Sequence, residues 1–185
     1  MQFNACNDYF FIIDEINRGN LSKIFGELFM LIEKDKRGIE LRLLYSDENF
    51  SVPANVYIIG MMNTADRSLA MLDYALRRRF SFFTMKPGFN TPGFQAYQDS
   101  LKNDAFNKLI ACVKQLNSQI VEDISLGEGF CIGHSYFCGL TPETANTQTL
   151  SSIVEYELIP LLKEYWFDEP AKIVDWSDRL RSAVK

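Results

Sequence analysis

The sequence predicts an α/β fold in which parallel strands and helices come first and a smaller helical part follows. Two observations predict it. Tyr9–Ile13 and residues 56–62 are short apolar segments that each end in polar side chains, the pattern of strands buried on both faces of a parallel sheet. From about residue 89 the apolar side chains recur instead with the period of a helix. We therefore expect an α/β part over residues 1–88 and a helical part over residues 89–185.

Composition excludes several classes of protein. Apolar residues make up 47% and charged residues 23% of the 185 positions, which excludes a disordered chain. A net charge of −5 argues against a general nucleic-acid coat, because an acidic surface repels phosphate. The apolar runs are far shorter than the roughly 18 residues that cross a bilayer, and no signal peptide opens the sequence, so we expect no membrane contact and a cytoplasmic location. The four cysteines are expected to be free thiols.

The first predicted strand, Tyr9–Ile13, runs into two carboxylates, Asp14 and Glu15. Asn20 then caps a predicted helix that ends in a polar run. The apolar positions of this helix follow the helical period, at Leu21, Ile24, Phe25, Leu28, Phe29 and Ile32. Residues 39–52 alternate apolar and polar side chains around a central turn, which predicts a β-hairpin.

The second predicted strand, residues 56–62, also delivers polar side chains at its carboxyl end. These are Asn63, Thr64, Asp66 and Arg67. A helix follows, marked by Leu69, Leu72 and Leu76, and it runs into three consecutive arginines. Residues 80–85 predict a third strand, and the Pro-Gly pairs within residues 87–93 predict a linker.

Two apolar stripes predict helices in the carboxyl-terminal part. The first consists of Phe106, Leu109, Ile110, Val113, Leu116 and Ile120. The second consists of Ile153, Leu158, Leu161, Leu162 and Tyr165. We expect the second helix to bend or break near Pro160, because proline lacks the N–H group that a helix needs.

Asp14 and Glu15 at the end of an apolar strand have the Walker B arrangement of P-loop NTPases. There the first carboxylate holds Mg²⁺ through water, and the second orients or deprotonates the attacking water. The alternative interpretation is a pair of acids at a helix start, where carboxylates are favourable. Asn63, after the second strand, favours the NTPase interpretation, because ligands of open α/β sheets gather at the carboxyl ends of the strands. Taken alone, Asn63 also fits a turn with a helix N-cap.

The three consecutive arginines, residues 77–79, also allow two interpretations. One or two cations complement the negative end of a helix dipole. Successive helical residues point about 100° apart, so three arginines cannot share one surface. At least one of them is then able to reach a neighbouring subunit as an arginine finger.

Three segments of the sequence resemble the McrB family of AAA+ GTPases, the motor subunits of restriction systems that depend on modified cytosine. They are residues 10–26 (FFIIDEINRGNLSKIFG), 56–82 (VYIIGMMNTADRSLAMLDYALRRRFSF) and 127–137 (GEGFCIGHSYF). The resemblance extends along nearly the whole chain. It implies a partial AAA+ P-loop NTPase core, with residues 39–52 as its pre-sensor-1 hairpin, followed by an α-helical lid.

The resemblance also implies a role for individual positions. Asp14 resembles the Walker B magnesium residue, Glu15 the catalytic glutamate and Asn63 the sensor 1 residue. Asp66 and Arg67 belong to the signature that continues from sensor 1, and we expect them to contribute to the nucleotide site.

Arg78 and Arg79, with Arg18 as a further candidate, resemble residues that reach the nucleotide of the adjacent subunit. The implied cofactors are Mg²⁺ and GTP, with ATP as the second choice. The implied assembly is a homo-oligomer, a hexameric ring in the parent protein, that works with a McrC-like nuclease subunit. DNA is contacted through that complex.

The sequence departs from the family at the phosphate-binding loop. No G-x-x-x-x-G-K-[ST] motif occurs, and none of the ten glycines is followed by lysine. We therefore expect the chain to be a carboxyl-terminal fragment of a McrB-like motor that is inactive alone. In an AAA+ sheet of order 5-1-4-3-2, residues 80–85 then lack their neighbouring strand, and the open sheet edge is expected to cause self-association. The alternative is a non-catalytic AAA+-derived interaction module.

His134 lies between Cys131 and Cys138, which gives three candidate zinc ligands. A zinc site normally needs a fourth ligand or an open water position, and no second Cys/His pair is near in the sequence. The resemblance instead favours a segment at the entry of the lid, close to where other AAA+ proteins carry the sensor 2 arginine. Residues 127–137 contain no arginine, so we expect His134 only to order the lid.

The carboxyl-terminal aromatic residues allow two further interpretations. The set consists of Tyr156, Tyr165, Trp166, Phe167 and Trp176. Aromatic side chains of this kind form stacking platforms for bases. Because acidic residues are interspersed among them, packing within the lid or against another subunit is favoured.

Overall fold

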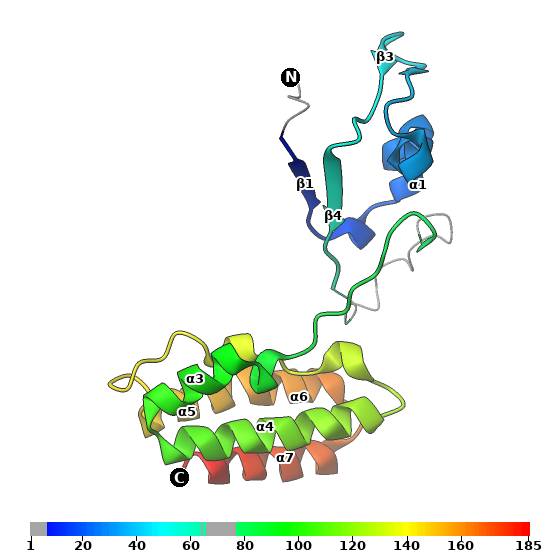
Figure 1. The fold of residues 1–185 in the computed structure, drawn as a ribbon. Helices are drawn as coiled ribbons and strands as arrows, with labels where there is room; N and C mark the ends of the chain where they lie inside the picture. The colour runs from blue at the N-terminus through cyan, green and yellow to red at the C-terminus, as the bar shows by residue number, and fades with distance from the viewer. Residues whose placement is uncertain (1–6, 64, 66–76) are drawn as a thin grey trace. The chain divides into compact units, whose positions relative to one another are not determined.

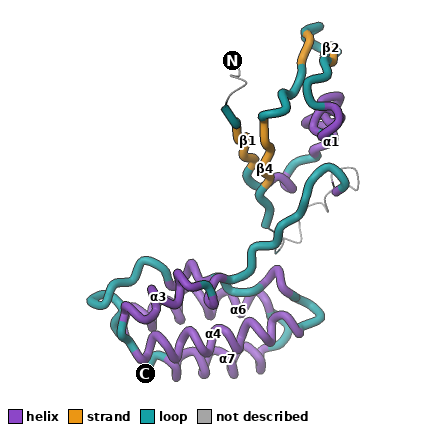
Figure 2. The backbone as a smooth tube through the Cα atoms, in the orientation of Figure 1, coloured by secondary structure: helices purple, strands orange, loops and turns teal. Residues whose placement is uncertain are grey.

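The computed structural model describes residues 7–63, 65 and 77–185. The chain divides into two compact units, Met1–Phe83 and Thr84–Lys185, which we call the amino-terminal unit and the helical unit. The amino-terminal unit contains the strands, and the helical unit contains helices and loops (Figures 1 and 2).

Two parallel strands form the centre of the amino-terminal unit. β1 (Tyr9–Ile13) pairs with β4 (Val56–Gly60), with Tyr9 opposite Val56 and Ile13 opposite Gly60. Both predicted strands and their parallel pairing are confirmed. The predicted burial of both strands on both faces is wrong: Phe10, Phe11 and Ile12 of β1 are each more than half exposed, and Tyr57 and Ile59 of β4 are exposed as well. Burial on both faces requires a layer over each face, and the described part of this unit supplies too few covering side chains.

The predicted helix after Asn20 is an α-helix only in its first half. α1 (Leu21–Phe25) is followed directly by η2 (Gly26–Ile32), a 3₁₀-helix. Gly26 has a φ of 48°, in the left-handed region that glycine tolerates, and this ends the α-helical turn. Two shorter 3₁₀-helices flank the segment: η1 (Ile16–Arg18) and η3 (Lys34–Lys36). Among the described residues of the unit, Ile16, Phe29 and Ile32 form a small buried cluster, and partly buried apolar side chains pack against it.

The predicted hairpin is confirmed but short. β2 (Leu41–Arg42) and β3 (Asn49–Phe50) pair in antiparallel fashion. Arg42 forms an ion pair with Asp47 across the connecting turn. The third predicted strand, residues 80–85, is not formed, and Phe83 in it is 89% exposed. Its N–H and C=O groups have no neighbouring strand to pair with in the described part of the unit. The predicted helix around Leu72 lies outside the described residues.

The helical unit is built from five α-helices among its described residues. They are α3 (Pro92–Leu101), α4 (Asp104–Glu122), α5 (Thr147–Ile153), α6 (Ile159–Tyr165) and α7 (Pro170–Ala183). Short 3₁₀-helices, η4 (Gly88–Asn90), η5 (Glu128–Phe130) and η6 (His134–Phe137), lie in the connections. The prediction of a linker extending to residue 93 is wrong, because Pro92 begins α3. Thr91 caps that helix by accepting a hydrogen bond from the Phe94 N–H.

Every one of these helices contributes to a single apolar core. The predicted stripe of α4 is confirmed, and its six members are 1% exposed or less. The second stripe is confirmed in part: Ile153, Leu158 and Leu162 are buried, and the other two members pack against the core. α7 was not predicted from the sequence. It brings Trp176, Leu180 and the following Val184 into the same core.

The helix around Pro160 continues through a π-helical turn. η7 (Val154–Leu158) joins α5 to α6 and has the wider i→i+5 bonding of a π-helix. Pro160 cannot donate a backbone hydrogen bond, and the wider turn directly before it accommodates the missing donor. The sequence therefore predicted the position of the irregularity, and the structure shows a bulge with helix on both sides of it.

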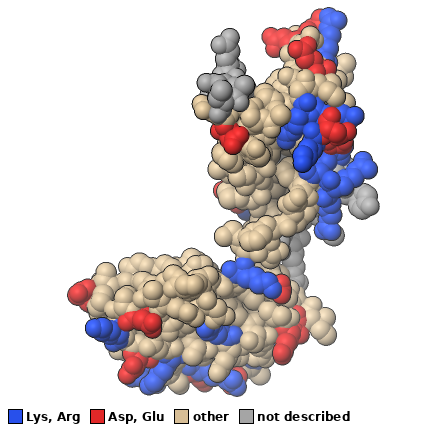
Figure 3. Space-filling model, in the orientation of Figure 1, with Lys and Arg blue, Asp and Glu red and all other residues tan. Residues whose placement is uncertain are grey.

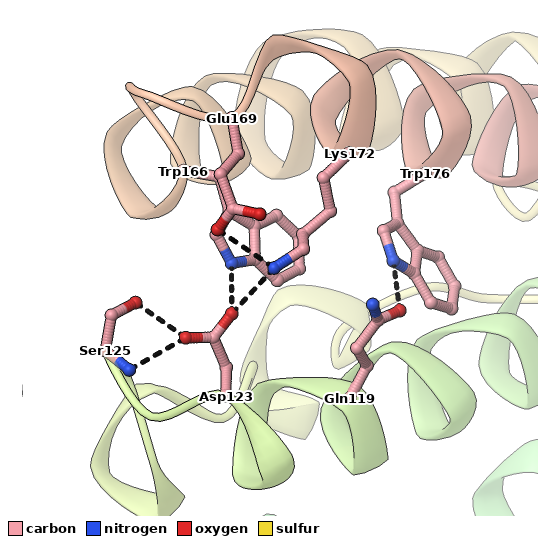
Figure 4. Close-up of polar contacts among 7 residues, drawn as sticks. All are labelled: Gln119, Asp123, Ser125, Trp166, Glu169, Lys172 and Trp176. Carbon is pink, nitrogen blue, oxygen red and sulfur yellow. Dashed lines mark hydrogen bonds and ion pairs between the residues drawn. The ribbon is translucent and has the colours of Figure 1, made fainter.

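A partly buried polar cluster joins α4, α6 and α7 (Figure 4). Asp123, which follows α4, accepts hydrogen bonds at one carboxylate oxygen from Trp166 Nε1 and Lys172 Nζ, both at 2.8 Å. Its other oxygen accepts from the backbone N–H and the hydroxyl of Ser125, at 2.8 and 2.6 Å. Lys172 foremost, with the other donors, holds the pKa of the Asp123 carboxyl well below its usual range. Lys172 also pairs with Glu169.

The aromatic residues of the carboxyl-terminal region divide into two groups. Trp166 and Trp176 are almost fully buried, and their indole N–H groups donate to Asp123 and Gln119 (Figure 4). Tyr156 and Phe167 are about four-fifths exposed, at 80% and 81%. The favoured interpretation, packing within the unit, is therefore confirmed for the two tryptophans.

Candidate active site

Asp14 and Glu15 lie directly after β1, where the chain turns into η1. Both side chains are exposed. Asp14 Oδ1 accepts a hydrogen bond from the Glu15 N–H at 2.9 Å. Glu15 has φ 50° and ψ 43°, the left-handed region that a residue with a side chain rarely adopts. Strained backbone of this kind clusters at functional sites, and here it places two neighbouring carboxylates at one turn.

Asn63 lies three residues beyond the end of β4, at the same edge of the sheet. The parallel pairing places Ile13 opposite Gly60, so both strands end together. Two backbone hydrogen bonds at 2.9 Å extend the pairing past the strands: Met61 N–H donates to Ile13 O, and Ile16 N–H donates to Met61 O. Asn63 Oδ1 accepts a hydrogen bond from the Ala65 N–H, the geometry of an Asx turn. The structure therefore brings Asp14, Glu15 and Asn63 to one edge.

Asn17 joins the two segments that carry these side chains. Its Nδ2 donates to the main-chain oxygen of Asn63 at 3.4 Å, and its side chain is largely buried. In the sequence, Asn17, Arg18 and Gly19 are typical of a turn, and nothing further was expected of Asn17. A polar residue two places beyond a carboxylate pair was the available signal, although turns contain asparagine so often that the signal is weak.

Arg18 contacts Glu15 within its own chain. The guanidinium Nε lies 3.0 Å from Glu15 Oε2, and both side chains are more than half exposed. An exposed pair of this kind has a small net free energy, about 0–1 kcal/mol, so it opens readily when another partner competes.

The three arginines at residues 77–79 have different surroundings. Arg79 lies inside the amino-terminal unit, with its guanidinium 2.5 Å from Glu33 Oε1 and 4.4 Å from the centre of the Phe29 ring. Its side chain is only 11% exposed. Arg77 and Arg78 are exposed. Figure 3 shows that Lys and Arg side chains gather on one flank of this unit, with a few carboxylates among them.

Two residues predicted at the site, Asp66 and Arg67, lie outside the described residues. The structure therefore brings together Asp14, Glu15 and Asn63, adds Asn17 to them and places Arg18 beside Glu15.

His134 has a different surrounding from that of a zinc ligand. Its Nδ1 accepts a hydrogen bond from the Gly88 N–H at 3.0 Å, and its ring packs edge-on against Phe89 and Phe94. Burial foremost, with the nearby Glu128, raises the pKa of the Cys131 thiol, which disfavours the thiolate that binds metal. Among the residues that the structure describes, no three His, Cys, Asp or Glu side chains are grouped as a metal site requires.

None of the described helices has the length and apolarity that crossing a membrane requires. Of the four cysteines, Cys112, Cys131 and Cys138 are free thiols, as predicted, and Cys6 lies outside the described residues.

Two family models match the chain, one in each unit. The model of the AAA domain, dynein-related subfamily, matches residues 3–80, and the model of the McrB α-helical lid domain matches residues 108–174. The chain is 53% identical over 182 residues to the type IV methyl-directed restriction enzyme EcoKMcrB subunit of Escherichia coli strain K12. The chain belongs to the McrB-like AAA+ family. The amino-terminal unit is thus AAA+ core, and the helical unit contains the McrB-type lid.

A second relative is the type II restriction enzyme BsuMI component YdiS of Bacillus subtilis strain 168, which is 29% identical over 148 residues. The alignments cover 93% and 69% of this chain. They cover 40% of the E. coli protein and 43% of the B. subtilis protein, so the chain spans less than half the length of either relative.

Proposed function

We propose that these 185 residues supply the hydrolytic side of a nucleoside-triphosphate site in a McrB-like restriction motor. The substrate is GTP, with ATP as the second choice. The observation that carries the proposal is the meeting of Asp14, Glu15 and Asn63 at the carboxyl ends of two paired parallel strands, β1 and β4. In open α/β sheets this edge is where phosphate ligands bind.

Each of the three side chains has a chemistry suited to phosphoryl transfer. Asp14 is a carboxylate at an exposed turn, the hard oxygen ligand that Mg²⁺ prefers, and would hold the ion through water. The bound ion supplies neutralisation of the phosphate charge. Glu15 orients or deprotonates the attacking water, and Asn63 holds that water against the γ-phosphate.

The arginines act between subunits in this proposal. Arg78 and Arg79 reach the nucleotide of the adjacent subunit, and Arg18 is the further candidate. Arg18 and Arg79 each have an ion pair in their own unit, to Glu15 and Glu33. Those pairs exchange for phosphate contacts when subunits assemble. Asp66 and Arg67 complete the site from the segment that follows sensor 1.

The remaining phosphate contacts come from a Walker A loop outside these 185 residues, because no such motif occurs within them. We therefore expect the chain alone to be inactive. The relatives are named as a restriction enzyme subunit and a restriction enzyme component, which supports a multisubunit restriction complex. In it, a hexameric ring of the parent protein drives DNA translocation and works with a McrC-like nuclease subunit.

Steady-state hydrolysis in a protein that joins this chain to an upstream Walker A segment tests the proposal. We expect Mg²⁺-dependent turnover of GTP, slower turnover of ATP, and none from the 185 residues alone. Glu15→Gln is expected to abolish turnover and to spare nucleotide binding, because the amide keeps the size of the side chain and loses its basicity. Full turnover in Glu15→Gln would show that Glu15 is not the catalytic residue.

The alternative, a non-catalytic interaction module, predicts a different result from the same protein. It gives no hydrolysis even when the upstream segment and Mg²⁺ are present, and it still joins a ring or binds a partner through the lid. The absence of a Walker A motif from the 185 residues is the observation that favours it.

A further inference from the structure

Asn17 is the one asparagine at the candidate site that lies in a buried position among the described residues. Its side chain is 9% exposed, whereas Asp14, Glu15 and Asn63 are all exposed. Desolvating an amide is unfavourable unless hydrogen bonds replace its contacts with water. The burial of the Asn17 amide therefore requires an explanation, whereas an exposed asparagine in a turn would not.

The orientation of the Asn17 amide follows from its neighbour. A main-chain oxygen, that of Asn63, lies 3.4 Å from one end of the amide. Only the nitrogen end of an amide donates to a carbonyl oxygen, so Nδ2 faces Asn63 and Oδ1 faces the opposite way. Oδ1 is buried and has no hydrogen-bond partner among the residues that the structure describes.

The backbone conformation explains why the Asn17 side chain contacts the main chain of Asn63. The left-handed conformation of Glu15 turns the chain so that Ile16 and Asn17, the next two residues, point inward. The Ile16 N–H then bonds to Met61 O at 2.9 Å, the last backbone link between the two segments. Asn17 extends the connection one step further, from the turn that carries Glu15 to the main chain of Asn63.

We propose that Asn17 is a positioning residue that acts through Asn63. The hydrogen bond from Nδ2 fixes the main chain of Asn63 relative to the Glu15 turn, so that the Asn63 amide and the Glu15 carboxylate address the same water. This inference rests on the proposed function, because it assigns Asn17 a part in the same hydrolysis. The group that matters is the N–H donor, and the unpartnered Oδ1 is not required for turnover.

Two substitutions separate the donor from the acceptor. Asn17→Ala removes both groups, and Asn17→Asp keeps an acceptor in the same volume but replaces the donor with a second oxygen against Asn63 O. We expect both to lower kcat about 10- to 100-fold, the loss that a small displacement of a reacting group causes. The dissociation constant for nucleotide is expected to stay within about twofold, because in this proposal Asn17 acts through Asn63 and makes no contact of its own with the nucleotide.

Asn55→Ala is the matched control. Asn55 Nδ2 donates to Asn7 O at 2.7 Å and so bridges the same two chain segments at the opposite end of the strands. We expect kcat to be unchanged in this variant.

The experiment measures kcat and nucleotide affinity in the protein joined to its Walker A segment, for Asn17→Ala, Asn17→Asp, Asn63→Ala and the double variant Asn17→Ala/Asn63→Ala. If Asn17 acts through Asn63, the double variant has the same kcat as Asn63→Ala. Three results would each overturn the inference. Asn17→Asp has the kcat of the wild type, the losses in kcat add up in the double variant, or the Asn17 variants lose nucleotide affinity together with kcat. Glu15→Gln in the same assay separates failure of this inference from failure of the proposed function. If Glu15→Gln keeps full turnover, the proposed function fails; if Glu15→Gln loses turnover and Asn17→Asp does not, only the inference about Asn17 fails.

Discussion

The two units of the chain achieve stability in different ways. In the helical unit, all five α-helices contribute to one apolar core, and the buried indole N–H groups have acceptors. The core cluster of the amino-terminal unit consists of Ile16, Phe29 and Ile32. Its strands carry apolar side chains into solvent, Phe10 at 63% and Tyr57 at 48% exposure among them.

This difference shows that the helices of one unit can bury their apolar side chains against each other, whereas two parallel strands cannot bury theirs without further strands and helices. A helix forms its own apolar stripe from residues three or four positions apart and buries it against other helices of the same unit, as α7 does against α4 and α6. A parallel strand needs neighbouring strands and covering helices that come from distant parts of a chain. The described part of the amino-terminal unit has two such strands, and the nucleotide edge is formed where they end.

Phe106→Ala provides the largest contrast between the units. Phe106 is fully buried in α4 and stacks edge-on against Phe137, so the substitution is expected to cost about 3–5 kcal/mol of unfolding free energy. Phe10→Ala, at an exposed strand position, is expected to change it by about 0.5 kcal/mol or less. Both tryptophans lie in the helical unit, so urea unfolding followed by their fluorescence reports on that unit. Equal losses in the two variants would contradict the comparison.

Asp123→Asn tests the partly buried polar cluster of the helical unit. The hydrogen bonds from Lys172 and its neighbours lower the pKa of the Asp123 carboxyl, so its contribution to stability is present above the unfolded pKa of about 4. The contribution is lost as the pH falls through the lower pKa of the folded state. We expect the variant to lose about 1–3 kcal/mol at pH 7, with Lys172 left partly buried.

The pH series supplies the control for this prediction. The difference in unfolding free energy between wild type and Asp123→Asn should shrink as the pH is lowered from about 5 toward 2, because Asp123 then takes up a proton in the unfolded state of the wild type and so favours unfolding, whereas the amide of the variant does not titrate. A difference that is constant over this range would mean that the carboxylate charge does not stabilise the unit.

Gly88→Ala tests how the residues before α3 are held against the rest of the helical unit. A Cβ at Gly88 would lie 2.9 Å from the imidazole of His134, so the ring must move and its hydrogen bond from the residue 88 N–H is lost. We expect a loss of about 1–2 kcal/mol and faster hydrogen exchange at residue 88. Gly93→Ala is the matched control, because nothing lies within 4 Å of its added Cβ, and it should be neutral or slightly stabilising. Unchanged exchange at residue 88 would contradict the account.

Phe10→Lys has the smallest expected effect on unfolding, and it tests whether the exposed strands of the amino-terminal unit cause self-association. Exposed apolar strands and open edges favour self-association, so the wild-type chain is expected to be larger than a monomer by size-exclusion chromatography with light scattering. The added charge should shift it toward the monomer, with the fluorescence-detected unfolding of the helical unit unchanged. A stable wild-type monomer would mean that the open sheet does not cause association.

The sequence predicted the elements whose pattern is local. The stripe of α4, the position of the two parallel strands and the irregularity at Pro160 follow from periodicity and from proline chemistry. α7 was missed because charged residues separate Trp176 and Leu180, whose burial depends on packing against α4 and α6. The 3₁₀ continuation at η2 depends on the left-handed backbone of Gly26, which a periodicity of apolar side chains does not reveal.

The sequence likewise predicted part of the candidate site and missed the part that depends on tertiary contacts. Asp14, Glu15 and Asn63 follow apolar strands, a signal that is visible in the sequence, and the structure brings them to one edge. The connection through Asn17 was not predictable, because it depends on the left-handed turn at Glu15 and on a contact between residues 46 positions apart. The position of Arg79 against Glu33 and Phe29 likewise arises from tertiary packing.

A structure of the assembled protein with Mg²⁺ and a slowly hydrolysed GTP analogue tests the central claim most directly. We predict that the water next to the Mg²⁺ lies within hydrogen-bond distance of the Asp14 carboxylate, about 3 Å. We also predict that the Glu15 carboxylate and the Asn63 amide converge on one water beside the γ-phosphate. A nucleotide bound away from the carboxyl ends of β1 and β4, with none of these three side chains near its phosphates, would contradict it.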